Sequence, residues 1–516
     1  MGRGQTRAGA RAAVAKKLDR IRCLLGLFAG VVAAAACFPT AAVAQLQATA
    51  QRGHGVVGTV RVRNLDATPP ISRAEIGRHP QPLAPLTGVS PAEYEARKSR
   101  AAIQRFAPNG DILPPPTPAP RFGAPLTPTA GHFTGISQTP CGGSTPADQA
   151  LAVGDTPVGV LQALNVCLAV YNRDGTLSPG YPKSLTSFVG LPANTPTSDP
   201  RALYDWINHR YVLVFIQFDR NFASASSYWL AVSKGDDPAG DYCTFNLPVQ
   251  SVAPVGGVFP LPDFPRLGQD REAIYLASNV FLSKTVYKWE EILVLPKDKL
   301  YDCQQPNDFA QFSGLKLGNV FTDTTQPANI ANPWDDPRAE YLVTSKNINF
   351  GGGTCKNGCN GLLVWTISTQ PSGPSIKSFL VATKFNYSLP PSASQPGAAN
   401  SVDTGDTRIS GSVMYSAGSL YASLAGNGGQ AHPGLILYQI HPFVDDNGEI
   451  KSAQILNEIP FGIGGKSSRF FPTQVPDAEG NVTTVFNFSD ASNFVGLAYF
   501  SRRAAQSVGT AHDSGQ

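Results

Sequence analysis

Short runs of β-branched and aromatic residues recur from about residue 150 to residue 501, and turn residues separate them. The runs come in pairs, such as 211–218 (YVLVFIQF) with 227–233 (SYWLAVS), or 482–488 (VTTVFNF) with 495–501 (VGLAYFS). Gly, Pro, Asn and Asp fill the gaps, and no helical periodicity of useful length interrupts the pattern. The sequence therefore predicts many short antiparallel strands joined by tight turns.

The strand pairs repeat at intervals of 51 to 81 residues. Their expected openings are Asp148, Asp199, Arg266, Pro327, Arg408 and Pro472. Repeats of about 40–50 residues or more, with four strands in each, are typical of propeller blades, and loop insertions lengthen the intervals. We expect an all-β fold, a six-bladed β-propeller with seven blades as the alternative, over residues 131–503. A strand near 132–137 (HFTGIS) is expected to complete the last unit and close the ring.

The first 44 residues have the order of a secretory signal peptide. Seven basic residues open the chain, an apolar run covers 23–37, and Ala42-Val43-Ala44 offers a cleavage site. The run is short for a membrane span, so we expect a secreted or periplasmic protein with no transmembrane segment in the mature chain. An uncleaved anchor, or a lipoprotein attached through Cys37, is the alternative.

Residues 45–130 are rich in Pro, Ala and Arg, which predicts an arm or linker or a segment that wraps the main domain. A short helix is expected over 91–106 (PAEYEARKSRAAIQRF). Residues 504–516 read as a polar tail.

Removing the leader changes the charge and the cysteine count. The chain has 41 basic and 37 acidic residues, and the leader holds 7 and 1 of them, so the rest carries a net charge of −2. No basic run remains, which disfavours a nucleic-acid partner. Six cysteines remain, and in an exported chain they predict disulfides. Cys355 and Cys359 are the expected local pair, with a zinc site as the rival interpretation.

Several motifs in order resemble a family of secreted bacterial sialidase-like β-propeller proteins, mostly uncharacterised. They are ADQALAVG (147–154), LAVYNRDG (168–175), SDPR (198–201), DPAG (237–240), DFPRLGQD (263–270) and DTGDTR (403–408). The resemblance covers about residues 140–503 and implies the fold rather than a function. No segment matches the Ser-x-Asp-x-Gly-x-Thr-Trp turn of true sialidases, so their chemistry is not implied.

Three arginines stand at equivalent openings of the repeats, namely Arg201, Arg266 and Arg408, and Arg469 is a possible fourth. Inner strands of a propeller converge on its axis, so these residues are expected to line one mouth of a central channel. There they are candidates for binding a carboxylate or sulfate, together with Asp199, Asp263 and Asp406. The alternative is that each Asp–Arg pair only fixes its loop.

Two functions remain open from the sequence. The first is a binding module for an acidic glycan or a partner protein. The second is a carbohydrate-active enzyme, a glycoside hydrolase or polysaccharide lyase, in which nearby carboxylates act as acid and base. Asp148, Asp205, Asp270 and Asp403 widen the choice of carboxylates. Arginines that face a pocket with an Asp pair or a Tyr would favour the enzyme. No cofactor and no metal are expected. The absence of a nucleotide loop, a nucleophile elbow and a zinc-protease motif argues against a nucleotide enzyme, an α/β hydrolase and a zinc protease.

Overall fold

The computed structural model describes residues 48–72, 88–103, 133–137, 139–141, 146–219, 221–346, 359–397, 401–427, 432–462, 467–504 and 512–513. All of them belong to one folded unit, which spans Gln47–Gln516. The predicted signal peptide lies outside the described residues. No helix among the described residues is long and apolar enough to cross a bilayer.

Among the described residues, the chain forms six consecutive antiparallel units of four strands. The first two units contain β3 (Ala150–Val153), β4 (Val160–Leu164), β5 (Cys167–Tyr171) and β6 (Lys183–Ser184), then β7 (Thr197–Asp205), β8 (Arg210–Gln217), β9 (Ser227–Ser233) and β10 (Asp241–Pro248). The next two contain β11 (Leu261–Gln269), β12 (Ala273–Ser283), β13 (Val286–Pro296) and β14 (Phe309–Leu317), then β16 (Gln326–Ile330), β17 (Glu340–Ser345), β18 (Cys359–Ser368) and β19 (Ser375–Tyr387). The last two contain β20 (Val413–Ser416), β21 (Ser419–Asn427), β22 (Pro433–Val444) and β23 (Ile450–Phe461), then β24 (Ser468–Pro476), β25 (Val482–Ser489), β26 (Gly496–Arg502) and β27 (His512–Asp513).

The middle strands read as continuous apolar runs because a neighbouring sheet covers each of their faces. Phe215 of β8 belongs to the same core cluster as Leu168 of β5, in the first unit. The adjacent Val214 belongs instead to a cluster with Leu276 of β12, in the third unit. Successive side chains of a strand point to opposite faces, so β8 is buried on both sides. Further clusters join the third unit to the fourth, the fourth to the fifth and the fifth to the sixth.

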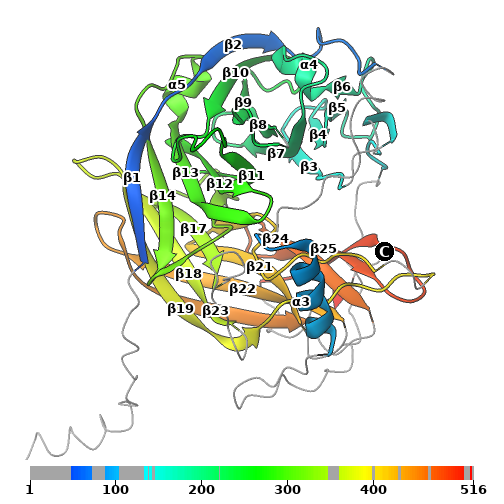
Figure 1. Ribbon diagram of the computed structural model, residues 1–516, viewed down its shortest axis with the longest axis vertical. Helices are drawn as coiled ribbons and strands as arrows, with labels where there is room; N and C mark the ends of the chain where they lie inside the picture. The colour runs from blue at the N-terminus through cyan, green and yellow to red at the C-terminus, as the bar shows by residue number, and fades with distance from the viewer. Residues whose placement is uncertain are drawn as a thin grey trace, which may run out of the picture. The chain divides into compact units, whose positions relative to one another are not determined.

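The first strands of the units lie side by side. β11 pairs with β16 in parallel, and β16 pairs in parallel with β20. Face-to-face sheets with adjacent inner strands are the arrangement of a β-propeller, and the units follow one another through it in chain order (Figure 1).

The N-terminal segment supplies an outer strand to two of the units. β1 (Ala48–Gly55) pairs with β14, and β2 (Thr59–Asn64) pairs with β10, at the outer edges of the third and second units (Figure 1). Both strands cover a sheet edge that would otherwise expose unpaired backbone groups. The predicted short helix is confirmed as α3 (Pro91–Ile103).

The prediction of a closing strand near 132–137 is wrong for residues 133–137, which are the part of this range that the structure describes. Residues 133–137 form no strand, and the fourth strand of the last unit is β27, paired with β26. Residues 133–137 contact the first unit instead. The Phe133 ring lies 5.5 Å from the Tyr171 ring, and the Ile136 amide donates to Gln162 Oε1 at 3.0 Å.

Two disulfides cross-link the described part of the chain. Cys141 of a short 3₁₀ helix (Thr139–Cys141) pairs with Cys167 of β5, and Cys243 of β10 pairs with Cys303. Cys359 is also disulfide-bonded. Its predicted partner Cys355 lies outside the described residues, so that pairing stays a prediction.

Candidate functional site

The inner strands enclose a cavity of about 1410 Å³. Its lining includes all six residues that the sequence singles out as ligand-binding candidates: Arg201, Arg266, Arg408, Asp199, Asp263 and Asp406. They enter near the openings of β7 and β11 and just before β20. We call this end of the cavity, where the inner strands begin, the mouth.

A backbone irregularity turns the side chains at the strand openings. Asp199 and Phe264 have left-handed φ angles of 55° and 51°, and Phe471 of β24 has 51°. At all three places the pairing with the next strand shifts register. A bulge of this kind bends the strand and redirects its side chains, and such conformations of non-glycine residues often accompany functional sites.

A group of carboxyls lies at one side of the mouth. Asp199 Oδ1 accepts from Ser198 Oγ at 2.5 Å, and Asp199 Oδ2 accepts from the Phe264 amide at 3.0 Å. Burial and the neighbouring charge of Asp199 raise the pKa of Asp148 to about 6, although Arg201 opposes the shift. Burial and Asp199 also raise the pKa of Asp263 well above its usual range. Asp148 is therefore a carboxyl that can give up its proton near neutral pH.

Arg266 is a structural residue. Its guanidinium donates to the carbonyl oxygens of Thr325 and Phe264 and forms a 2.8 Å ion pair with Glu290 of β13. Both charged side chains are 0% exposed. Burial lowers the pKa of Arg266 and raises the pKa of Glu290, and each charge opposes the shift of its partner. These three bonds tie the guanidinium to the protein interior, and its side chain has no exposed surface.

Arg408 and Asp406 form a local pair of the kind that the sequence left open. Arg408 Nη2 lies 2.6 Å from Asp406 Oδ2, and Arg408 Nε lies 2.8 Å from Asp406 Oδ1. The pair is bidentate, and it holds the pKa of Asp406 below its usual range against the effect of burial. It fixes the loop that precedes β20.

Arg201 differs from the other two arginines. Its Nη1 donates to the Pro200 carbonyl oxygen at 2.8 Å, and among the described residues no carboxylate forms an ion pair with it. Its guanidinium lies 4.7 Å from the centre of the Phe264 ring, and those of Arg266 and Arg408 lie 5.6 Å and 5.5 Å away. One aromatic ring thus gathers all three cations, and Arg201 is the one that forms no ion pair with a carboxylate in the part of the chain that the structure describes.

Helix α3 also reaches this cavity, which the sequence did not indicate. Tyr94 and Arg97 contribute to the lining, and the Tyr94 hydroxyl donates to Asp403 at 2.9 Å. Lys98 is buried and donates to the carbonyl oxygens of Pro390 and Gly405 and to Thr404 Oγ1. The bonds of Lys98 to Thr404 and Gly405 hold α3 beside the loop that carries Asp406.

Glu290 is a second residue that the sequence missed. Two adjacent glutamates inside the apolar strand β13 were the available signal, because charged side chains in a buried strand need partners. Glu291 meets the Tyr228 hydroxyl at 2.6 Å, just as Glu290 meets Arg266.

No protein-family model matches the chain, and no curated protein matches it. Solved structures do. The Hadza microbial sialidase Hz136 matches at 12% identity and a TM-score of 0.36, over 69% of this chain and 65% of its own length. An α-L-arabinanase of Cellvibrio cellulosa matches at 12% identity and a TM-score of 0.26, over 60% of this chain and 94% of its own length. An exo-β-1,3-galactanase of Clostridium thermocellum matches at 12% identity and a TM-score of 0.29, over 68% of this chain and 74% of its own length. The chain thus spans less than two thirds of the sialidase. TM-scores of this size carry no argument about chemistry.

Proposed function

We propose that the protein is an exported carbohydrate-active enzyme, a six-bladed propeller that cleaves glycosidic bonds at the mouth of its cavity. The observation that carries this proposal is the group of Asp148, Asp199 and Asp263 at the mouth, in which burial and the charge of Asp199 raise the pKa of Asp148 and of Asp263. Arg201 lies in the same cavity, and so does Tyr94. This combination is the feature expected to favour an enzyme over a pure binding module.

The carboxyls suit acid–base cleavage of a glycosidic bond. A pKa of about 6 lets Asp148 donate a proton to the departing sugar oxygen and take one back in a later step. The Asp199 carboxylate is oriented by Ser198 and by the Phe264 amide, as a base or nucleophile must be. Burial and Asp199 raise the pKa of Asp263, which favours its protonated form as a hydrogen-bond donor to a sugar hydroxyl. Arg201 supplies a charge for an acidic sugar.

Export is part of the same proposal. Two described disulfides suit an oxidising compartment, and an external polysaccharide is met only outside the cell. A secreted or periplasmic location follows from the expected signal peptide.

The test is to incubate residues 45–516 with a panel of acidic and neutral polysaccharides. Reducing ends report hydrolysis, and the ultraviolet absorbance of unsaturated uronates reports a lyase. We expect Asp148→Asn to lower the rate by about 10²–10⁴-fold, the usual contribution of a general acid. Asp477→Asn is the matched control, because the Asp477 carboxylate accepts hydrogen bonds from Glu479 and Asn481 of its own exposed turn between β24 and β25.

A full panel without product would remove the enzyme from consideration. Retained binding of one glycan, measured by calorimetry, would then support the binding module. Arg266→Ala is a poor control in these experiments because Arg266 pairs with Glu290 in the interior, so its loss would act through folding. Arg201→Ala tests the same side of the mouth without breaking an ion pair among the described residues.

A further inference from the structure

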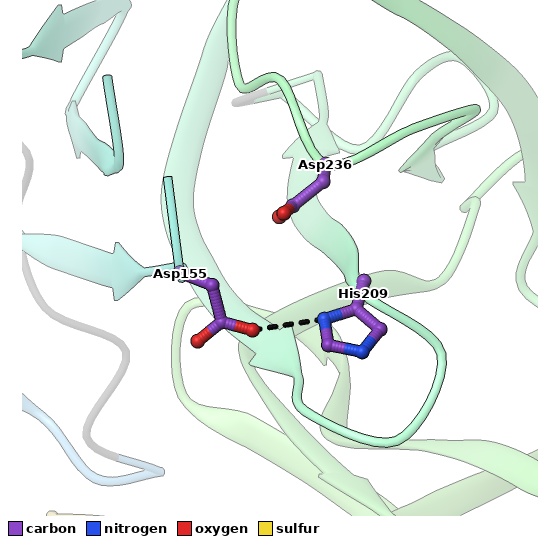
Figure 2. A group of neighbouring side chains, drawn as sticks. All are labelled: Asp155, His209 and Asp236. Carbon is purple, nitrogen blue, oxygen red and sulfur yellow. Dashed lines mark hydrogen bonds and ion pairs between the residues drawn. The ribbon is translucent and has the colours of Figure 1, made fainter. Parts of the chain in front are cut away.

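Three turns of the first two units meet at the end of the inner strands opposite the mouth. Asp155 lies in the turn between β3 and β4, His209 in the turn between β7 and β8, and Asp236 in the turn between β9 and β10. Their side chains converge from three separate segments (Figure 2). β7 begins near Asp199 at the mouth and ends just before His209, so this cluster is distinct from the carboxyl group described above.

The side-chain nitrogen and oxygen atoms of this cluster that could bind a metal ion surround one point. One atom from each of the three side chains lies within 4.8 Å of the others. His209 Nδ1 lies 2.8 Å from Asp155 Oδ2. The Tyr204 hydroxyl donates to Asp236 Oδ1 at 2.5 Å and lies 3.3 Å from His209 Nδ1 and 3.5 Å from Asp155 Oδ2. An imidazole, a phenol and two carboxylates therefore share one small volume.

The charge of the cluster is unbalanced. Among the described residues, no lysine or arginine forms an ion pair with Asp155 or Asp236, and their neighbours in the cluster are an imidazole and a neutral hydroxyl. Close carboxylates repel each other unless a cation lies between them. The side chains of His209 and Asp155 are 54% and 41% exposed, so an ion can enter from solvent.

We propose that Asp155, His209 and Asp236 bind a divalent transition metal, with Zn²⁺ as the preferred ion. Imidazole nitrogen with carboxylate oxygen is a common zinc ligand set, whereas calcium takes oxygen ligands almost alone. On binding, His209 gives its Nδ1 lone pair to the metal and carries its proton on Nε2. The metal replaces the Asp155–His209 hydrogen bond, and the Tyr204 oxygen or water completes the shell.

The metal would join the first unit to the second at the far end of the cavity. The Tyr204 ring lies 4.8 Å from the Trp206 ring in an edge-on contact, and both residues line the cavity. Trp206 belongs to the same β7–β8 turn as His209. A metal in the cluster would therefore hold in place the aromatic wall at that end. This site does not depend on the proposed glycosidase activity.

The test is titration of Zn²⁺ into the chelator-treated full mature chain, followed by calorimetry and by the metal-dependent rise in Tm. We expect one Zn²⁺ per chain. Asp236→Asn and His209→Gln should each weaken it by more than about tenfold, since even the partners of zinc ligands matter that much. The visible spectrum of bound Co²⁺ should disappear in the same variants.

The chain offers a matched control in another His–Asp pair. His54 Nδ1 lies 2.8 Å from Asp308 Oδ1 on the surface, and it belongs to no group of three ligands among the described residues. His54→Gln should bind Zn²⁺ as the unchanged chain does. Absence of Zn²⁺ binding by the unchanged chain would overturn the proposal. So would full affinity in both site variants, or an equal loss in His54→Gln.

Discussion

Arg201 and Arg266 occupy the same place in two neighbouring units but have different surroundings. Each lies two residues after a left-handed residue at the opening of an inner strand, and each follows a proline. Arg266 is fully buried and paired with Glu290, whereas Arg201 is partly exposed and donates a hydrogen bond to the carbonyl oxygen of Pro200. The two arginines show that one sequence motif can serve the interior in one unit and the cavity in the next.

The strand register explains the difference. In the third unit Arg266 pairs with Ala277, and two positions further along β12 Asn279 pairs with Glu290. In the second unit Arg201 pairs with Val214, and two positions further along β8 Ile216 pairs with Tyr228. A tyrosine thus stands where the third unit has its glutamate. Its hydroxyl binds Glu291 of the next unit, so Arg201 has no buried glutamate at the position where Arg266 has Glu290.

The largest expected effect is on the interior arginine. Arg266→Met should lower the free energy of unfolding by about 3–5 kcal/mol, because it leaves the Glu290 charge buried without its partner. Denaturant titration measures the change. Adding Glu290→Gln should restore most of the loss, since it removes the stranded charge and keeps an acceptor for the Thr325 amide. A double variant no more stable than the single one would contradict the explanation.

A smaller effect concerns the carboxyl beside Arg201. The pKa of Asp148 is raised from 3.8 to about 6, so the folded protein holds a proton that the unfolded chain releases. Asp148 therefore contributes stability that is complete below pH 3.8 and is lost as the pH rises through about 6, up to about 3 kcal/mol.

In Asp148→Asn this contribution is gone, so unfolding midpoints measured from pH 4 to 7 should fall less steeply than in the unchanged chain. Equal slopes for the two proteins would show that Asp148 titrates normally in the fold. The surface variant Asp477→Asn should keep the slope of the unchanged chain.

The smallest effect on stability is expected at Arg201. Arg201→Ala should lower the free energy of unfolding by less than about 1 kcal/mol, the size of a partly exposed contact between a cation and a ring. The same denaturant titration measures it, beside Arg266→Met. A loss as large as that of Arg266→Met would end the distinction between the two arginines.

Much of the fold was accessible from the sequence because it follows from local patterns. Strands such as β8 and β9 show as apolar runs, and the turns between them carry Gly, Asn and Asp. The six candidate residues line one cavity because equivalent openings of repeated units meet around it. The short helix α3 was also expected, although its place beside the mouth was not.

The sequence did not show which residues far apart in the chain contact each other. The expected closing strand failed because a run of strand-forming residues becomes a strand only where a sheet edge is free to pair with it, and β27 occupies that edge of the last unit. Pairing Arg266 with Glu290 requires the register of β11, β12 and β13 together. The cluster of Asp155, His209 and Asp236 draws on three turns, and none of these turns carries a metal-binding motif by itself.

The sequence alone determined the strands, the repeated units and the positions of the arginines, because strand propensity, turn chemistry and side-chain alternation act over a few residues. The tertiary structure alone decided which charges are buried, which face the cavity and which meet across units. Burial and Coulomb interactions depend on distances through space, and strand register and sheet packing set those distances.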